Sequence, residues 1–204
     1  IMLFFLTMGA SFRKDAIIMF VALIGGLIIE SWGTQTELWR YYTEFPPYEN
    51  PSRPPWWIIP AWPISSLAIN RIYLFLDAVI LKPYLRPFQV GYWVFCVGFA
   101  FIFYQFTHYT WHLSWTKIFT VATIIIVAFP KNDHRKHFLI LIAGTSLGYF
   151  LELWGTTRAC WIYYTGETPP LMVVFAHGIA SVGFTRGATL IQFLLTKMIN
   201  ARAK

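Results

Sequence analysis

Long apolar runs recur along the chain, and they constrain its fold more than any other feature of the sequence. A helix needs about 20 apolar residues to cross a hydrocarbon core about 30 Å thick. Runs near that length lie at 16–34, 56–81, 89–109, 115–130, 137–157 and 170–197, and the opening IMLFFLTMGA is expected to belong to a further helix. Turn and breaker segments such as EFPPYENPSRPP separate them. The sequence therefore predicts an all-α, polytopic integral membrane helical bundle of about seven spans, with residues 1–204 forming a single transmembrane domain.

The charge distribution supports this prediction and gives the bundle an orientation. Charged residues make up 12% of the chain, against about 25% in soluble domains, and the net charge is +7. One side of the predicted spans carries Arg13, Lys14, Lys82, Arg86, Lys131, Arg135, Lys136, Lys197, Arg202 and Lys204, and the other side carries Arg40, Arg53, Lys117 and Arg158. By the positive-inside rule we expect the basic loops to be cytoplasmic and the aromatic loops to lie on the outer side. Membrane lipid is the expected surrounding, and no nucleic-acid partner is expected.

A stretch of fourteen residues occurs twice. ESWGTQTELWRYYT at 30–43 returns as ELWGTTRACWIYYT at 152–165, with eight identical positions. The helices that follow also match, since PAWPISSLAINR at 60–71 aligns with FAHGIASVGFTR at 175–186 and pairs Trp62 with His177. We therefore predict two helical-hairpin repeats, approximately 13–81 and 134–197. Two spans lie between them, so both copies have the same orientation, and such parallel repeats are normally related by an axis along the membrane normal.

Two glutamates begin the repeated motif inside predicted spans. At 1.5 Å per residue, Glu30 and Glu152 both lie about 9 Å below the outer face, and so do His177 and Trp62. An intramembrane carboxylate is costly enough that a functional role is the first hypothesis. Glu30, Glu152 and His177 are therefore the candidate catalytic residues. The alternative interpretation is that both glutamates are structural and accept hydrogen bonds from neighbouring helices.

Arginines and histidines nearer the ends of the spans have separate expected roles. Arg71 and Arg186 lie roughly 13 Å from the glutamates in depth, too far for a direct pair, and we expect them to snorkel to the inner boundary. His108 and His112 have the i, i+4 spacing of two metal ligands on one helix face. A metal site there, completed by His177 and a glutamate, competes with a purely interfacial role. No phosphate-binding glycine loop is present, so no nucleotide cofactor is expected, and the identity of any other cofactor is left open.

Aromatic side chains surround the predicted glutamate layer. Burial in an apolar bundle disfavours the charged form of a carboxyl group, which makes each glutamate a candidate proton donor. Aromatic faces stabilise cations by up to about 2 kcal/mol each in a dry site. The candidate substrate-binding residues are Trp32, Trp39, Tyr41, Tyr42, Trp62, Trp154, Trp161, Tyr163 and Tyr164. This combination suits protonation of an isoprenoid double bond followed by stabilisation of the tertiary carbocation.

The stretch GLIIESWGTQTELWRYYT, continued by PPWWIIPAWP, resembles a family of membrane carotenoid-biosynthesis proteins that hydrate acyclic carotenoid ends. The likeness is firmest over residues 25–64, where Glu30, Gly33 and Thr36 give a Glu–x–x–Gly–x–x–Thr pattern, and the second copy is its weaker echo. The resemblance implies a polytopic α-helical protein that acts on a C40 polyene, with Glu30 as the candidate acid.

Three functions remain open from the sequence. The first is a carotenoid- or isoprenoid-modifying enzyme, a hydratase- or cyclase-like lyase, in which a buried glutamate initiates hydration or cyclisation of a polyene end. The second is a non-catalytic accessory subunit that binds carotenoid, quinone or lipid and has other membrane subunits as partners. The third is a small transporter built on the parallel repeat.

Overall fold

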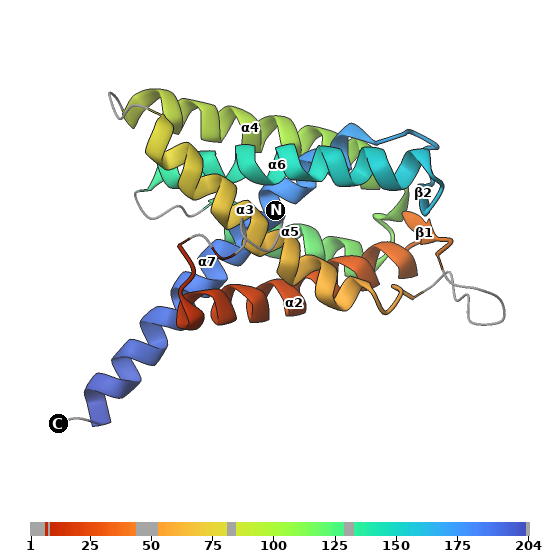
Figure 1. The fold of residues 1–204 in the computed structure, drawn as a ribbon. Helices are drawn as coiled ribbons and strands as arrows, with labels where there is room; N and C mark the ends of the chain where they lie inside the picture. The colour runs from red at the N-terminus through yellow and green to blue at the C-terminus, as the bar shows by residue number, and fades with distance from the viewer. Residues whose placement is uncertain (1–6, 8, 44–52, 81–84, 129–132, 203–204) are drawn as a thin grey trace.

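The structure is a computed structural model that describes residues 7, 9–43, 53–80, 85–128 and 133–202. In these residues it forms six α-helices: α2 (Phe12–Gln35), α3 (Ile58–Val79), α4 (Leu85–Thr107), α5 (Ser114–Ala128), α6 (His134–Thr157) and α7 (Leu171–Arg202). A 3-10 turn, η1 (His108–Thr110), follows α4, and two short strands, β1 (Trp39–Tyr41) and β2 (Trp161–Tyr163), follow α2 and α6 (Figure 1). The prediction of an all-α bundle is confirmed.

Four of the helical segments are long and apolar enough to cross a membrane. They are Phe12–Gln35, Pro87–Thr110, His134–Thr157 and Leu171–Ala201, and the shorter helical segment Ser114–Val127 is also apolar. Their length and composition support an integral membrane protein. The predicted helix at the start of the chain lies largely outside the described residues, as does most of the proline-rich segment at 44–55.

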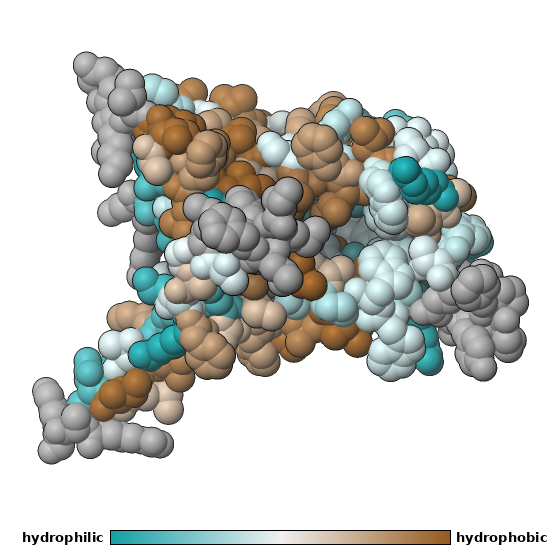
Figure 2. Space-filling view, viewed as in Figure 1, coloured by the Kyte–Doolittle hydropathy of each residue, from teal (hydrophilic) through white to brown (hydrophobic). Residues whose placement is uncertain are grey.

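The surface of the bundle is suited to lipid. On α4, Val90, Val94, Val97 and Phe101 are between 61% and 69% exposed and share one face of the helix. Apolar side chains cover much of the face seen in Figure 2, and hydrophilic ones gather toward the ends of the helices. A soluble monomer rarely exposes such a continuous apolar surface.

Helices α6 and α7 form a close seam built on glycine. An added Cβ at Gly144 of α6 would lie 2.9 Å from the Gly178 Cα of α7, which no real side chain tolerates. Small residues at four-residue spacing allow membrane helices to approach this closely. This seam carries His177, one helical turn from Ser181, and so sets the position of one wall of the site described below.

The two strands join the halves of the chain. β1 and β2 pair in an antiparallel ribbon with the register Trp39↔Tyr163, Arg40↔Ile162 and Tyr41↔Trp161. The turns that lead into them each contain a residue with positive φ, Glu37 at 58° and Ala159 at 52°. Alternation along the ribbon buries all four of its Trp and Tyr side chains to at least half, while Arg40 and Ile162 are exposed. We call this end of the bundle the aromatic end.

The opposite end, called here the basic end, carries Arg13, Lys14, Arg135 and Lys136 at the starts of α2 and α6 and Lys197 near the end of α7. The expectation that Arg71 snorkels to the inner boundary is wrong, because its side chain is buried. Arg71 is 4% exposed and its Nη2 lies 2.7 Å from the Asp15 carboxylate, because that counter-charge stands inside the first turn of α2. Arg186 also turns inward, where its guanidinium donates to the carbonyl of Ile126 and the hydroxyl of Tyr92.

Candidate functional site

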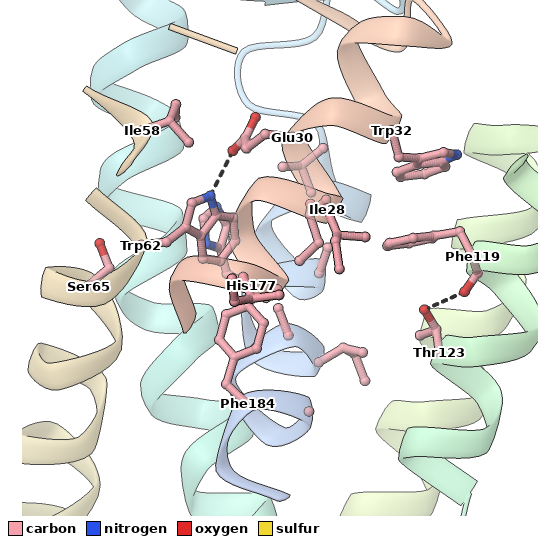
Figure 3. A pocket seen from close by; sticks show the side chains of 18 of the residues that line it. Ile28, Glu30, Trp32, Ile58, Trp62, Ser65, Phe119, Thr123, His177 and Phe184 are labelled. Carbon is pink, nitrogen blue, oxygen red and sulfur yellow. Dashed lines mark hydrogen bonds between the residues drawn. The ribbon is translucent and has the colours of Figure 1, made fainter. Parts of the chain in front are cut away.

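A cavity of about 660 Å³ lies inside the bundle, lined by residues of all six described α-helices and both strands. Its walls are mainly aliphatic and aromatic, and Glu30, Glu152 and His177 are among the few polar lining side chains. Figure 3 shows Glu30, Trp62 and His177 grouped on one side of this space, with Phe119 of α5 on the other. The cavity volume is typical of sites for small apolar ligands.

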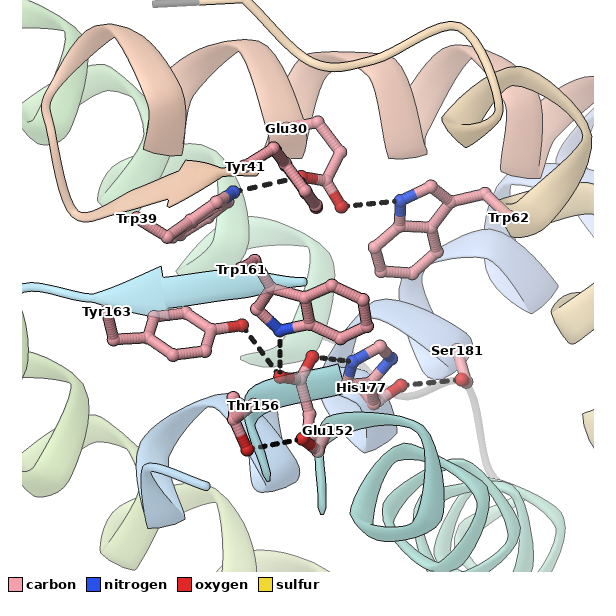
Figure 4. Close-up of polar contacts among 10 residues, drawn as sticks. All are labelled: Glu30, Trp39, Tyr41, Trp62, Glu152, Thr156, Trp161, Tyr163, His177 and Ser181. Carbon is pink, nitrogen blue, oxygen red and sulfur yellow. Dashed lines mark hydrogen bonds and ion pairs between the residues drawn. The ribbon is translucent and has the colours of Figure 1, made fainter. Parts of the chain in front are cut away.

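Glu30 is held by three hydrogen-bond donors. Its Oε2 accepts from the Trp39 indole N–H at 3.0 Å and from the Tyr41 hydroxyl at 2.7 Å. Its Oε1 accepts from the Trp62 indole N–H at 3.0 Å (Figure 4). The residue is 6% exposed, so these bonds replace water for a buried carboxyl group.

Glu152 has matching partners from the other half of the chain. Its Oε2 accepts from the Trp161 indole N–H at 2.9 Å and from the Tyr163 hydroxyl at 2.8 Å. Its Oε1 lies 2.9 Å from Nε2 of His177 (Figure 4). The first two partners stand nine and eleven residues after each glutamate, as in the first half. The third stands 32 residues after Glu30 and 25 after Glu152, and only this Trp62–His177 position differs in residue type.

The two carboxyl sites meet through their aromatic partners. The rings of Trp62 and His177 stack with centroids 5.3 Å apart and planes 19° from parallel. Tyr41 packs on Trp161 at 5.8 Å and Trp39 on Tyr163 at 5.8 Å across the ribbon. The structure therefore brings together the layer of Glu30, Glu152, Trp62 and His177, although the depth argument alone could not say which way the side chains faced.

The glycine of the repeated WGT motif leaves space for the tryptophan ring that donates a hydrogen bond to each glutamate. An added Cβ at Gly33 would fall inside the Trp39 ring, and one at Gly155 inside the Trp161 ring. One helical turn before each glutamate, Gly26 and Gly148 leave the same kind of seat for Trp62 and His177. The threonine of the motif closes the turn, since the Thr34 hydroxyl donates to the Glu30 carbonyl at 2.8 Å and that of Thr156 to the Glu152 carbonyl at 2.6 Å.

This packing predicts a large steric penalty at the motif glycines. Gly155→Ala is expected to lower the free energy of unfolding by about 2 kcal/mol, because a methyl group there displaces the Trp161 ring and lengthens its bond to Glu152. Gly98→Ala is the matched control, since an added Cβ on that helical glycine meets nothing within 4 Å. We expect it to stabilise the protein by about 0.5–1 kcal/mol. Unfolding in mixed detergent micelles measures both, and equal midpoints for the two variants would contradict the proposed role of the glycine seat.

Six of the nine predicted substrate-binding aromatic residues line the cavity: Trp32, Trp39, Tyr41, Trp62, Trp161 and Tyr163. Tyr42, Trp154 and Tyr164 are not among its lining residues and are exposed to 50%, 53% and 43%. Tyr42 and Tyr164 directly follow inward-facing tyrosines and so point to the other side of the ribbon. Trp154 packs against the guanidinium of Arg158, 5.3 Å from its ring centroid. The prediction that these three side chains belong to the site is corrected, because none of them lines the cavity.

Trp57 is a cavity residue that is not among the nine predicted substrate-binding residues. It lines the cavity, meets Tyr41 edge-on at 5.4 Å and lies 6.0 Å from Trp161. Trp57 is the last residue of the PPWW stretch and directly precedes α3. This position at the start of a helix is the sequence signal that could have indicated its place near the ribbon. Trp32 is placed differently from its counterpart Trp154, because Phe119 of α5 stacks on it at 4.2 Å.

The helical geometry behind the proposed histidine metal site is wrong. α4 ends at Thr107, so His108 begins the 3-10 turn and His112 lies beyond it, and the two do not share one α-helical face. Each donates through Nδ1 to a backbone carbonyl, His108 to Gln105 at 2.7 Å and His112 to Tyr109 at 2.9 Å. Within the described part of the chain, no three His, Cys, Asp or Glu side chains are grouped to hold a metal ion.

The ribbon tyrosines are fixed donors. Burial, and then the nearby charge of Glu30, raise the pKa of the Tyr41 hydroxyl well above 10, and burial and Glu152 do the same to the pKa of Tyr163. Both phenols therefore keep their protons and donate to the carboxyl groups.

The arrangement offers two buried carboxyl groups, aromatic faces and an apolar space at one end of a membrane bundle. Neither a protein-family model, a curated protein nor a solved structure matches the chain.

Proposed function

We propose that the protein binds the end of an isoprenoid or carotenoid polyene in its cavity and initiates hydration or cyclisation of that end by proton transfer from a buried glutamate. One observation carries this proposal: two carboxyl groups, ringed by indole and phenol side chains, stand at the aromatic end of an apolar cavity. The resemblance of residues 25–64 to carotenoid hydratases points to the same class of reaction.

The cavity has a side opening suited to a substrate dissolved in lipid. Phe20, Ile24 and Ile28 of α2 line the cavity and are at the same time 58%, 46% and 57% exposed, so the wall that they form is also outer surface. These residues cover about 12 Å of the helix. A long, thin apolar chain would lie along this opening with its end at the glutamates and the rest of its length among lipid chains.

Hydration and cyclisation of a polyene end both begin with transfer of a proton to carbon, and both need a site that stabilises the resulting carbocation. The carboxyl O–H bond breaks as a C–H bond forms at the polyene end, and the π electron pair of the double bond is consumed, leaving a tertiary carbocation on the adjacent carbon. Trp62, Trp57 and Trp161 line this end of the cavity, and aromatic rings of this kind stabilise such a cation. Water then adds to the cation and gives a proton to the carboxylate, which leaves an alcohol. In the cyclisation, a second double bond attacks the cation instead, and a ring carbon next to the new cation gives a proton to the carboxylate as a C=C bond forms.

The finer architecture belongs to the same proposal. We propose that the two hairpins are duplicated units related by an axis along the membrane normal, in a bundle of about seven spans. The matching partners of Glu30 and Glu152 and the pairing of β1 with β2 support this relation. We also propose that the basic end is cytoplasmic, because the sequence assigns ten lysines and arginines to that side of the spans and four to the other.

The second candidate function is that of a non-catalytic accessory subunit. The hydrogen bonds to the two carboxyl groups are also compatible with this function. Three donors on each carboxyl group are also what a purely structural acceptor would need. In that case the cavity would hold a carotenoid, quinone or lipid without changing it, and other membrane subunits would copurify with the protein.

Ligand retention tests the binding part of the proposal. Ala180 lines the cavity, so Ala180→Trp should fill it and reduce the polyene retained by purified protein at least about tenfold, measured by extraction and mass spectrometry. Ala201→Trp is the matched control, because Ala201 is exposed near the end of α7 and is not among the cavity-lining residues. Equal retention by both variants, or an extract without any isoprenoid after incubation with a polyene, would contradict the proposal.

A further inference from the structure

Two arginines occupy equivalent places near the basic end, and they have different partners. Arg71 and Arg186 are paired by the repeat. The stretch FRKD, which ends at Asp15, aligns with HRKH, which ends at His137, at the spacing that separates the two glutamates of the site. In the first hairpin the guanidinium of Arg71 donates to both carboxylate oxygens of Asp15, at 2.7 and 3.3 Å. In the second hairpin an imidazole stands in the position of that carboxylate.

Arg186 has no carboxylate partner within the described part of the chain. Its guanidinium donates to the carbonyl of Ile126 and, at 3.4 Å, to the hydroxyl of Tyr92, and none of the ion pairs among the described residues includes it. Its Nε is buried and makes no hydrogen bond there. Of the nine Asp and Glu residues in the sequence, only Glu44 and Glu49 lie outside the described residues, and both follow β1 in the sequence. A guanidinium enclosed by protein needs a counter-charge, so Arg186 is suited to bind an anion that the chain does not supply.

His137 offers a second donor beside Arg186. The residue is 7% exposed, and its Nδ1 makes no hydrogen bond with any described residue. The Tyr92 side chain contacts both groups, since its ring centroid lies 6.1 Å from that of His137 and its hydroxyl accepts the bond from Arg186. A neutral imidazole can carry its hydrogen on Nδ1. A buried nitrogen without an acceptor in the protein commonly marks a site for water or an ion.

The start of α6 adds positive charge around these two side chains. His134 and Lys136 stand in the first turn of α6, and the His134 ring lies 6.0 Å from that of Tyr92. Asp133 carries the opposing charge, but its carboxylate caps the helix by accepting from the backbone N–H of Lys136 at 3.1 Å. The N-terminal end of a helix also carries a partial positive charge. These groups favour an anion at Arg186.

We propose that Arg186 and His137 bind an oxyanion of a phosphate group, which takes the place that the Asp15 carboxylate has beside Arg71. Phosphate oxygens match the fork of N–H donors on a guanidinium. The basic end lies where a bundle of this length meets the headgroups of a membrane, so the expected source is the phosphate of an anionic lipid such as phosphatidylglycerol. An anionic headgroup is favoured over a zwitterionic one, because the positive start of α6 would repel a choline group.

Retention of lipid by purified protein in mixed micelles tests this site. The protein is equilibrated with equal amounts of phosphatidylglycerol and phosphatidylcholine, and the lipid that stays bound is measured by native mass spectrometry. We expect phosphatidylglycerol to be retained preferentially. His137→Asp should reduce its retention at least about tenfold, because the new carboxylate pairs with Arg186, as Asp15 pairs with Arg71, and repels phosphate. Arg186→Met should reduce it by a similar factor, because it removes the charged donor.

Two controls separate this site from the charge of the whole basic end. His137→Asn removes the same ring as His137→Asp but adds no charge, and its amide can still donate, so retention should be largely kept. Lys197→Met removes one positive charge from an exposed position near the end of α7 and should leave retention unchanged. In micelles without anionic lipid, His137→Asp should unfold at a higher temperature than His137→Asn, a result that also establishes that the variant is folded.

Phosphatidylglycerol retained equally by the unmodified protein, His137→Asp and Arg186→Met would overturn the site. So would its absence from the unmodified protein, unless inorganic phosphate raises the unfolding temperature of that protein and not of His137→Asp. That result would keep the oxyanion site and make free phosphate its source. No polyene is present in any of these measurements, so their outcome is independent of the proposed reaction.

Discussion

Glu152→Gln is expected to reduce polyene product formation by about 10²–10⁴-fold while the protein stays folded and keeps its ligand. The amide removes the transferable proton and preserves the shape of the side chain. Its oxygen still accepts from Trp161 and Tyr163, and its NH2 group faces Nε2 of His177, which accepts when the ring carries its proton on Nδ1. Every hydrogen bond of the site can therefore be kept. Product is measured by chromatography after incubation with an acyclic polyene.

Glu30→Gln provides an informative comparison. Whichever way the amide is turned, its NH2 group faces an indole N–H, that of Trp62 or that of Trp39, and two donors are opposed. A buried donor left without an acceptor costs about 1–3 kcal/mol, so this variant should lose stability where Glu152→Gln does not. Glu37→Gln is the neutral control, since Glu37 is exposed and pairs with Arg40 at the surface. Full activity of Glu152→Gln would exclude that residue as the acid.

Arg71→Met is expected to lower the free energy of unfolding by about 3 kcal/mol. The Arg71 side chain is 3% exposed and that of Asp15 15%, so removing the guanidinium leaves a carboxylate in a mostly dry place. Arg40→Met is the matched control, because the Arg40–Glu37 pair has side chains 46% and 64% exposed and should contribute no more than about 1 kcal/mol. Equilibrium unfolding in mixed micelles measures both.

A second variant keeps this prediction interpretable. Adding Asp15→Asn to Arg71→Met should recover part of the loss, because the orphaned charge is then removed. If Arg71→Met were as stable as Arg40→Met, the pair would have no structural role at the basic end.

Helices were the predictable part of this fold. The runs at 16–34 and 137–157 became α2 (Phe12–Gln35) and α6 (His134–Thr157), with ends extended by a few residues. Apolar length is a local property, so the sequence displays it directly. The common depth expected for Glu30, Glu152 and His177 also followed from the sequence, because a fixed rise per residue converts a residue's position in its helix into a depth.

The pairing of β1 with β2 and the identity of the residues that line the cavity could not be predicted from local sequence patterns. β1 and β2 have three residues each and lie 122 positions apart, so their pairing depends on tertiary structure and leaves no local pattern. Trp32 and Trp154 occupy equivalent motif positions, yet only Trp32 has Phe119 to pack against. His108 and His112 kept a helical spacing in sequence although the helix ends at Thr107.

Incubation in D2O with an acyclic polyene is the most direct test of the central claim, which is that a carboxyl group of this cavity delivers a proton to carbon. The account predicts a hydrated or cyclised product with one deuterium bound to carbon at the modified end, detected by mass spectrometry and lost in Glu152→Gln. A polyene that is retained by the protein but recovered unchanged would contradict it. So would carbon-bound deuterium that stays equal to that of the unmodified protein in both Glu152→Gln and Glu30→Gln.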